Sequence, residues 1–147
     1  MRSVAFLLPL LLPLAAFAGL GDKATTAIPG DSTAGAAVVR RAVPARSYTI
    51  QDIQARGGVA VREYVTADGR VFAVAWSGPV MPDLVELLSA YFPPYREEVQ
   101  KRGPSRAPVV IRRDDLVVES GGHMRSFRGR AYLPGMLPTD MSIDEIR

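Results

Sequence analysis

The chain of 147 residues contains no cysteine, a single histidine and a single tryptophan. Without cysteine it can form no disulfide, thiol nucleophile or cysteine-based metal site. Its stability must therefore come from an apolar core, which a chain of this length can bury as one domain. Since one histidine also makes a poor metal site, the sequence predicts no metal and no cofactor.

Lysine is also rare, and only Lys23 and Lys101 occur among the 18 basic residues. The chain has 15 acidic residues. The remaining basic residues are arginine, which suits bidentate recognition of anions but also follows from a GC-rich genome. Nucleic-acid binders usually carry a larger basic excess on one face than the net charge of +3 found here. We therefore expect no nucleic-acid partner.

Long hydrophobic runs are limited to the N-terminus, where Arg2 precedes an apolar stretch from Val4 to Leu14. The small-x-small sequence Ala16-Phe17-Ala18 follows, as at a signal peptidase site. The apolar stretch is shorter than the roughly 18–20 residues that cross a bilayer. The sequence thus predicts a Sec-type signal peptide over residues 1–18, cleavage after Ala18, a periplasmic or secreted protein, and no transmembrane segment in the mature chain.

Residues 19–46 are rich in Ala, Gly, Thr and Pro and contain no aromatic side chain. Such a segment buries too little apolar surface to offset the entropy of ordering. We expect a flexible leader over 19–46 and a single α+β domain over 47–147.

Alternating patterns within that domain predict an antiparallel sheet of about five or six strands, at residues 48–54, 59–65, 71–77, 109–112, 116–120 and 123–133. Gly121-Gly122 is expected to form the turn before the last strand. One main helix is expected at about residues 83–92, with Asp83 as its N-cap. Its apolar stripe should cover Trp76, and Pro93-Pro94 should end it.

The turn at residues 66–69 leaves the register of the central hairpin open. A two-residue turn pairs Val65 with Phe72, Glu63 with Val74 and Val61 with Trp76, whereas a bulge pairs Tyr64 with Phe72 and Arg62 with Val74. In both registers Phe72, Val74 and Trp76 share the helix side. The other apolar side needs cover from the C-terminal residues or from another protein, and an uncovered patch would be a binding surface.

Several short motifs occur together: VREYV, VFAVAW, GPxxPDL, SGGHM and GRAYLP. In these motifs the chain resembles a family of exported proteobacterial proteins of unknown function. The resemblance covers nearly all of the predicted domain, and it implies export and a common fold but no activity.

Arg62 and Glu63 are the first candidate site residues. As neighbours on a strand they point to opposite faces, so they do not pair with each other. The alternatives are cross-strand ion pairs that set the register or a ligand site built on the two charges. The candidate ion-pair partners are Asp52 or Glu119 for Arg62, and Arg125, Arg128 or Arg130 for Glu63.

His123 could serve a hydrolase-like site if a serine and a carboxylate lay beside it. Arg125, Arg128 and Arg130 occur in an acid-free stretch and could bind a polyanion. Tyr64 and Tyr95 could line a groove, with Tyr95 the tyrosine most expected at the surface.

The leading hypothesis is a non-enzymatic envelope protein that binds another exported protein or an envelope component, and a homo-oligomer is compatible with it. The alternatives are a hydrolase-like enzyme centred on His123 and a polyanion-binding protein.

Overall fold

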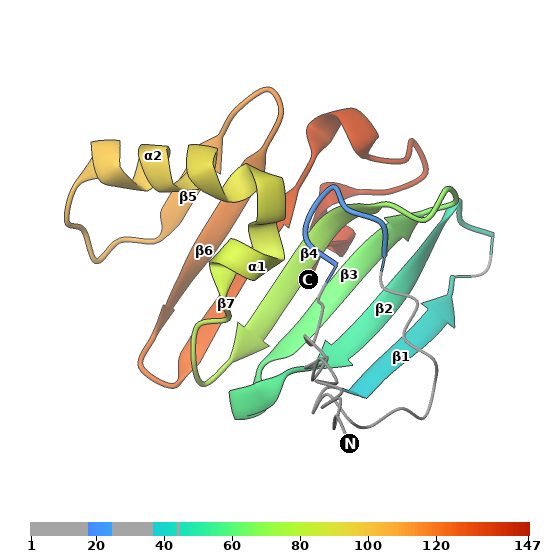
Figure 1. The fold of residues 1–147 in the computed structure, drawn as a ribbon, viewed down its shortest axis with the longest axis horizontal. Coiled ribbons are helices and arrows are strands. Elements are labelled where there is room, and N and C mark those ends of the chain that lie inside the picture. Colours follow the sequence, from blue (N-terminus) through green and yellow to red (C-terminus); the bar gives the residue numbers. More distant parts are fainter. Residues whose placement is uncertain (1–17, 25–36, 44) are drawn as a thin grey trace, which may run out of the picture.

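The computed structural model describes residues 18–24, 37–43 and 45–147 (Figure 1). The predicted signal peptide therefore lies outside the described residues except for Ala18. Residues 25–36 and 44 of the predicted leader also lie outside them.

One antiparallel sheet of seven strands forms the centre of the fold, in the order β1-β2-β3-β4-β7-β6-β5. Its strands are β1 (Ala37–Ala42), β2 (Tyr48–Gln54), β3 (Ala60–Thr66), β4 (Val71–Gly78), β5 (Val109–Arg112), β6 (Val117–His123) and β7 (Ser126–Tyr132). The α+β class is confirmed, but the predicted count of five or six strands was too low. The additional strand is β1, which pairs with β2 from within the segment expected to be a leader.

The helical region comprises α1 (Leu84–Leu88), a 3₁₀ turn (Ser89–Tyr91) and α2 (Phe92–Arg102). The predicted N-cap is confirmed, because Asp83 Oδ1 accepts hydrogen bonds from the amides of Val85 at 2.9 Å and Glu86 at 3.3 Å. The expected helix end at Pro93-Pro94 was wrong. Both prolines occupy the first turn of α2, where the amides that proline lacks have no partner within the helix.

The two faces of the sheet are covered by different parts of the chain. Figure 1 shows α1 and α2 across one face, which we call the helix face. Trp76 is 3% exposed there and belongs to one core cluster with Leu87 and Leu88, as the leucine stripe predicted. The C-terminal segment, residues 134–147, packs on part of the opposite face, which we call the tail face, where Ile146 joins a cluster with Phe72 and Tyr132.

The central hairpin follows the two-residue register at one end, since Val61 pairs with Trp76 and Glu63 with Val74. The register then shifts, so that Tyr64 pairs with Ala73 and Val65 with Val71. This bulge moves one residue to the other side of the sheet. Phe72 therefore lies in the tail-face cluster, and its expected place under the helix was wrong.

The hairpin between β6 and β7 also differs from expectation. Gly121 and Gly122 lie within β6, and the turn comes later, where His123 pairs with Ser126 across Met124 and Arg125. Arg125 adopts a positive φ of 67° in this turn. The last strand therefore does not begin at His123, and Arg125 does not belong to it.

Residues 18–24 contribute to the core. Leu20 is fully buried in the helix-face cluster, and its amide donates to the carbonyl of Leu87 at 3.0 Å. The next amide, of Gly21, donates to the carbonyl of Val71 at 2.8 Å. The residues directly after the predicted cleavage point thus tie α1 to β4. Among the described residues, no helix is both long enough and apolar enough to span a bilayer.

Candidate binding groove

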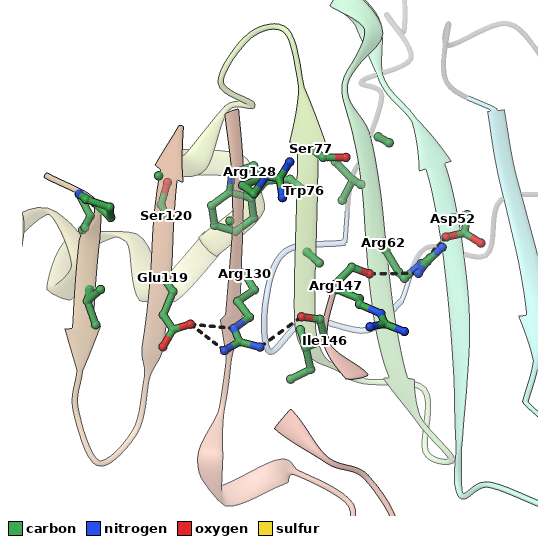
Figure 2. A pocket seen from close by; sticks show the side chains of 18 of the residues that line it. Asp52, Arg62, Trp76, Ser77, Glu119, Ser120, Arg128, Arg130, Ile146 and Arg147 are labelled. Carbon is green, nitrogen blue, oxygen red and sulfur yellow. Dashed lines mark hydrogen bonds and ion pairs between the residues drawn. The ribbon is translucent and has the colours of Figure 1, made fainter. Parts of the chain in front are cut away.

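The C-terminal segment leaves part of the tail face open, and this part forms a groove of about 940 Å³ across the sheet. Its lining comes from β2, β3, β4, β5, β6, β7 and the end of the C-terminal segment: Asp52, Gln54, Ala60, Val61, Arg62, Ala75, Trp76, Ser77, Pro108, Val109, Val110, Glu119, Ser120, Gly121, Arg128, Gly129, Arg130, Ile146 and Arg147. Figure 2 shows the labelled charged side chains on either side of β4.

One row of residues across the strands gives the groove its charges. In register order the row runs Asp52, Arg62, Ala75, Arg130, Glu119, each paired with the next on a neighbouring strand. The small residue Ala75 thus lies between the two arginines. On the side away from Ala75, each arginine has an acidic neighbour.

Both acids bind the arginine beside them. Arg62 Nε lies 2.6 Å from Asp52 Oδ1, and Arg130 Nε and Nη2 each lie 2.8 Å from Glu119 Oε2 (Figure 2). The hydrogen bond that Arg62 donates to Asp52 raises the pKa of Arg62, so this guanidinium stays charged. The cross-strand ion pair expected for Arg62 is therefore present, with Asp52 as the partner.

A second arginine reaches each acid from an edge strand. Arg41 Nη2 lies 2.7 Å from the second oxygen of Asp52, and Arg112 Nη2 lies 3.0 Å from the second oxygen of Glu119. Both acids therefore have a cation on each side, which leaves arginine charge in excess along the row.

The two inner arginines also bind the backbone of the C-terminal segment. Arg62 Nη1 donates to the carbonyl of Arg147 at 3.0 Å, and Arg130 Nη1 donates to the carbonyl of Ile143 at 2.9 Å. Tyr64 supports the same region, because its hydroxyl donates to the carbonyl of Glu145 at 2.8 Å. These contacts hold the C-terminal segment across β7, β4 and β3 as one wall of the groove.

The next row is small and open. Ala60, Ser77, Arg128 and Gly121 follow one another in register, so Arg128 stands among residues with little side chain. Arg128 is exposed, and within the described residues it makes no ion pair or side-chain hydrogen bond. The guanidinium of Arg147 is likewise without a bond to any described residue. The groove thus contains two cationic groups that have no ionic partner in the part of the chain that the structure describes.

Of the predicted site residues, the groove brings together Arg62, Arg128 and Arg130. Arg125 lies in the turn at the end of β6 and β7 and is absent from the groove lining. The expected polyanion-binding group of Arg125, Arg128 and Arg130 is therefore divided between two places.

Tyr64 and Glu63 have other surroundings. Tyr64 is buried and binds the C-terminal segment. Glu63 is fully buried, and its pairing with Val74 places it on the helix face, on the other side of the sheet from the groove.

Tyr95 lies in α2 and packs against the helix-face cluster, with its ring centroid 6.0 Å from that of Phe92. Burial raises the pKa of its hydroxyl. Tyr95 is half-buried, as is Tyr91, whereas the other three tyrosines are buried.

His123 is exposed at the last position of β6, and its Nδ1 lies 3.3 Å from the carbonyl oxygen of Met124. Within the described part of the chain, no carboxylate forms a hydrogen bond or ion pair with this ring. No group of three or more metal-ligating side chains occurs among the described residues either.

Arg147 and the small residues Ala60, Ala75 and Ser77 were missed as site residues. A weak signal was available, because these three alternate along β3 and β4 where a covered face would carry larger apolar side chains. Nothing local indicated that Arg147 would reach this face.

A comparison with known families places the chain in one of them. Residues 16–146 match the family described as "Protein of unknown function (DUF2844)", and the chain belongs to that family. No curated protein and no solved structure matched the chain.

Proposed function

We propose that this protein is exported, like the proteobacterial proteins that it resembles, and acts in the cell envelope as a non-enzymatic binding module. The groove on the tail face is its binding site, and its partner is another exported protein or an envelope component that carries negative charge. The observation that carries this proposal is the open row around Arg128, next to the ion-paired row. Among the described residues, neither the guanidinium of Arg128 nor that of Arg147, which also lines the groove, has a counter-charge.

Charge in the groove favours an anionic partner. Four lining arginines face two lining acids, and both acids are already shared with edge-strand arginines. A single arginine at a surface contributes little alone, but several around one concave site raise the local concentration of an anionic ligand.

The geometry supports binding better than hydrolysis. A general base needs a third group to orient it and a nucleophile within hydrogen-bond reach. The His123 ring instead contacts the carbonyl of its own neighbour, Met124, at an exposed hairpin end. A hydrolase centred on His123 is therefore the weaker alternative.

Photo-crosslinking in living cells tests the groove directly. A crosslinking amino acid at Ser77, which is exposed in the groove, should give a discrete adduct in the envelope fraction. The same amino acid at Ala67, which is exposed in the β3–β4 turn, serves as the control. Adducts that are absent at Ser77, or identical at both positions, would count against the groove. A product of twice the chain mass would identify a second copy as the partner.

Export is tested on the same cells. We expect the protein in the periplasmic or secreted fraction, with an N-terminal sequence that begins at Gly19. Replacement of Ala18 by Asp should block cleavage and leave the longer chain, since signal peptidase requires a small residue there. A cytoplasmic chain that keeps residues 1–18 would contradict the proposal.

A further inference from the structure

The tail face already holds one polypeptide, namely the end of the chain itself. Residues 143–147 cross from β7 to β3, because Arg130 binds the carbonyl of Ile143 and Arg62 binds the carbonyl of Arg147. Between these two contacts, Ile146 is buried in one cluster with Ala75. The face thus binds peptide through two features, arginine donors to backbone carbonyls and a floor of small residues that accepts an apolar side chain.

The groove repeats both features beside the C-terminal segment. Arg128 lies next to Arg130 on the same side of β7, and Ser77 and Ala60 continue the small floor on β4 and β3. Arg147 projects from the segment that forms the wall (Figure 2). A second segment placed here would run alongside residues 143–147 and meet guanidinium groups from the sheet and from the wall.

From this repetition we propose that the ligand of the groove is an extended polypeptide segment of a partner protein with acidic side chains. This inference rests on the proposed function, because it specifies the ligand of the same site. Arg62 and Arg130 are already bound to Asp52, Glu119 and backbone oxygens of the C-terminal segment. Arg128 and Arg147 have no counter-charge among the described residues, and a carboxylate can bind such a guanidinium in a bidentate manner.

The size of the groove indicates how much peptide it holds. From Ala60 on β3 to Gly121 on β6 there are three strand intervals, or about 14 Å at roughly 4.8 Å per interval. An extended chain rises about 3.3 Å per residue, so about four residues span this distance. Side chains of an extended segment alternate in direction, so that carboxylates can face the arginines while apolar side chains meet Pro108 and Val110.

A comparison of three anionic probes that differ in chemical backbone tests the inference. The first probe is a fluorescein-labelled decapeptide of alternating Glu and Val, and a Lys-Val decapeptide controls for charge. The second is labelled oligogalacturonate of similar charge, which has carboxylates but no amide carbonyls. The third is a vesicle that contains phosphatidylglycerol, which presents anionic headgroups. Binding to the mature chain is measured by fluorescence anisotropy, and by co-sedimentation for vesicles.

Three variants connect binding to the groove. Arg128→Ala removes a guanidinium of the groove that has no ion pair among the described residues. Arg125→Ala removes an equal charge from the β6–β7 turn, outside the groove. Ser77→Trp fills the groove without a change in charge. Thermal unfolding of all three by circular dichroism checks that they fold.

We expect the Glu-Val peptide to bind, with a Kd about tenfold higher for Arg128→Ala and unchanged for Arg125→Ala, and with binding abolished by Ser77→Trp. If oligogalacturonate or vesicles bind with this same variant pattern and the acidic peptide does not, the peptide inference is overturned and the proposed function stands. If no probe binds, or if Arg125→Ala weakens binding as much as Arg128→Ala, the groove is not the site and both proposals fail.

Discussion

Gly129 on β7 lies directly against the indole ring of Trp76, because a Cβ at position 129 would stand 2.3 Å from Cζ2 of that ring. The two residues are partners in the β4–β7 register, so the ring extends across the neighbouring strand at the place where the side chain is missing. The missing side chain thus leaves room for a large aromatic group in the core between the sheet and the helices.

Gly129→Ala should therefore destabilise the fold, since neither the backbone of β7 nor the buried ring can withdraw without cost. We expect the free energy of unfolding to fall by about 1–3 kcal/mol, as for other overpacked cores. Urea titration followed by tryptophan fluorescence measures this change. Gly135→Ala is the control, because a Cβ there meets nothing within 4 Å. An equal effect of the two substitutions would contradict the described packing.

The segment that follows the predicted cleavage point gives a second prediction. Leu20 is fully buried among helix-face residues, so Leu20→Ala should lower the free energy of unfolding of the mature chain by about 2–5 kcal/mol. Lys23→Ala, three residues away on an exposed side chain, should change it little. Urea titration of both variants distinguishes a structural role for residues 19–24 from that of a leader, which predicts no loss from either substitution.

Local signals predicted the local features of this fold well. Asp83 before an apolar stripe predicted the start of the helix, and Gly69 predicted the turn of the central hairpin, where it has a φ of 85°. These features depend on a few neighbouring residues, so a single sequence contains the information.

Features that depend on distant residues were predicted poorly. The bulge that turns Phe72 to the tail face is set by the packing of both faces, and both were apolar in the pattern. Strand β1 forms by pairing with β2, which lies elsewhere in the sequence, and its own composition resembles that of a linker. The same holds for the groove, because its charged row joins Asp52, Ala75 and Glu119 from three separate strands.

The attachment of the C-terminal segment leads to a third prediction. The Tyr64 hydroxyl donates to the carbonyl of Glu145 and accepts from the amide of Arg147 at 3.1 Å. Tyr64→Phe removes these partly buried hydrogen bonds, so we expect a loss of about 1–3 kcal/mol in the free energy of unfolding. Hydrogen exchange should also become faster at residues 145–147.

Tyr95→Phe provides the matched control, since the Tyr95 hydroxyl has no hydrogen bond within the described part of the chain. It should leave both the stability and the exchange of residues 145–147 close to those of the parent protein. Unchanged exchange at these residues in Tyr64→Phe would show that the hydroxyl does not hold the segment.

Acid should release the same segment through two carboxyl groups. The pKa of Glu145 is lowered, first by the Ser142 amide, which donates to it at 3.1 Å, and then by the Tyr48 hydroxyl. The pKa of Asp140 is lowered by the amide and hydroxyl of Ser47, at 2.9 and 2.8 Å.

Because both pKa values are lower in the folded chain than in the unfolded one, the stabilising contribution of these carboxyl groups is complete above the unfolded values of about 3.9 for Asp and 4.3 for Glu. It disappears as pH falls through the lower folded values. The amide resonances of Ser47 and Ser142 should therefore titrate in NMR spectra with midpoints below those unfolded values. Asp140→Asn should abolish the transition at Ser47 and preserve the one at Ser142, since each amide reports its own carboxylate. Midpoints at or above the unfolded values would mean that these hydrogen bonds do not hold the C-terminal segment in solution.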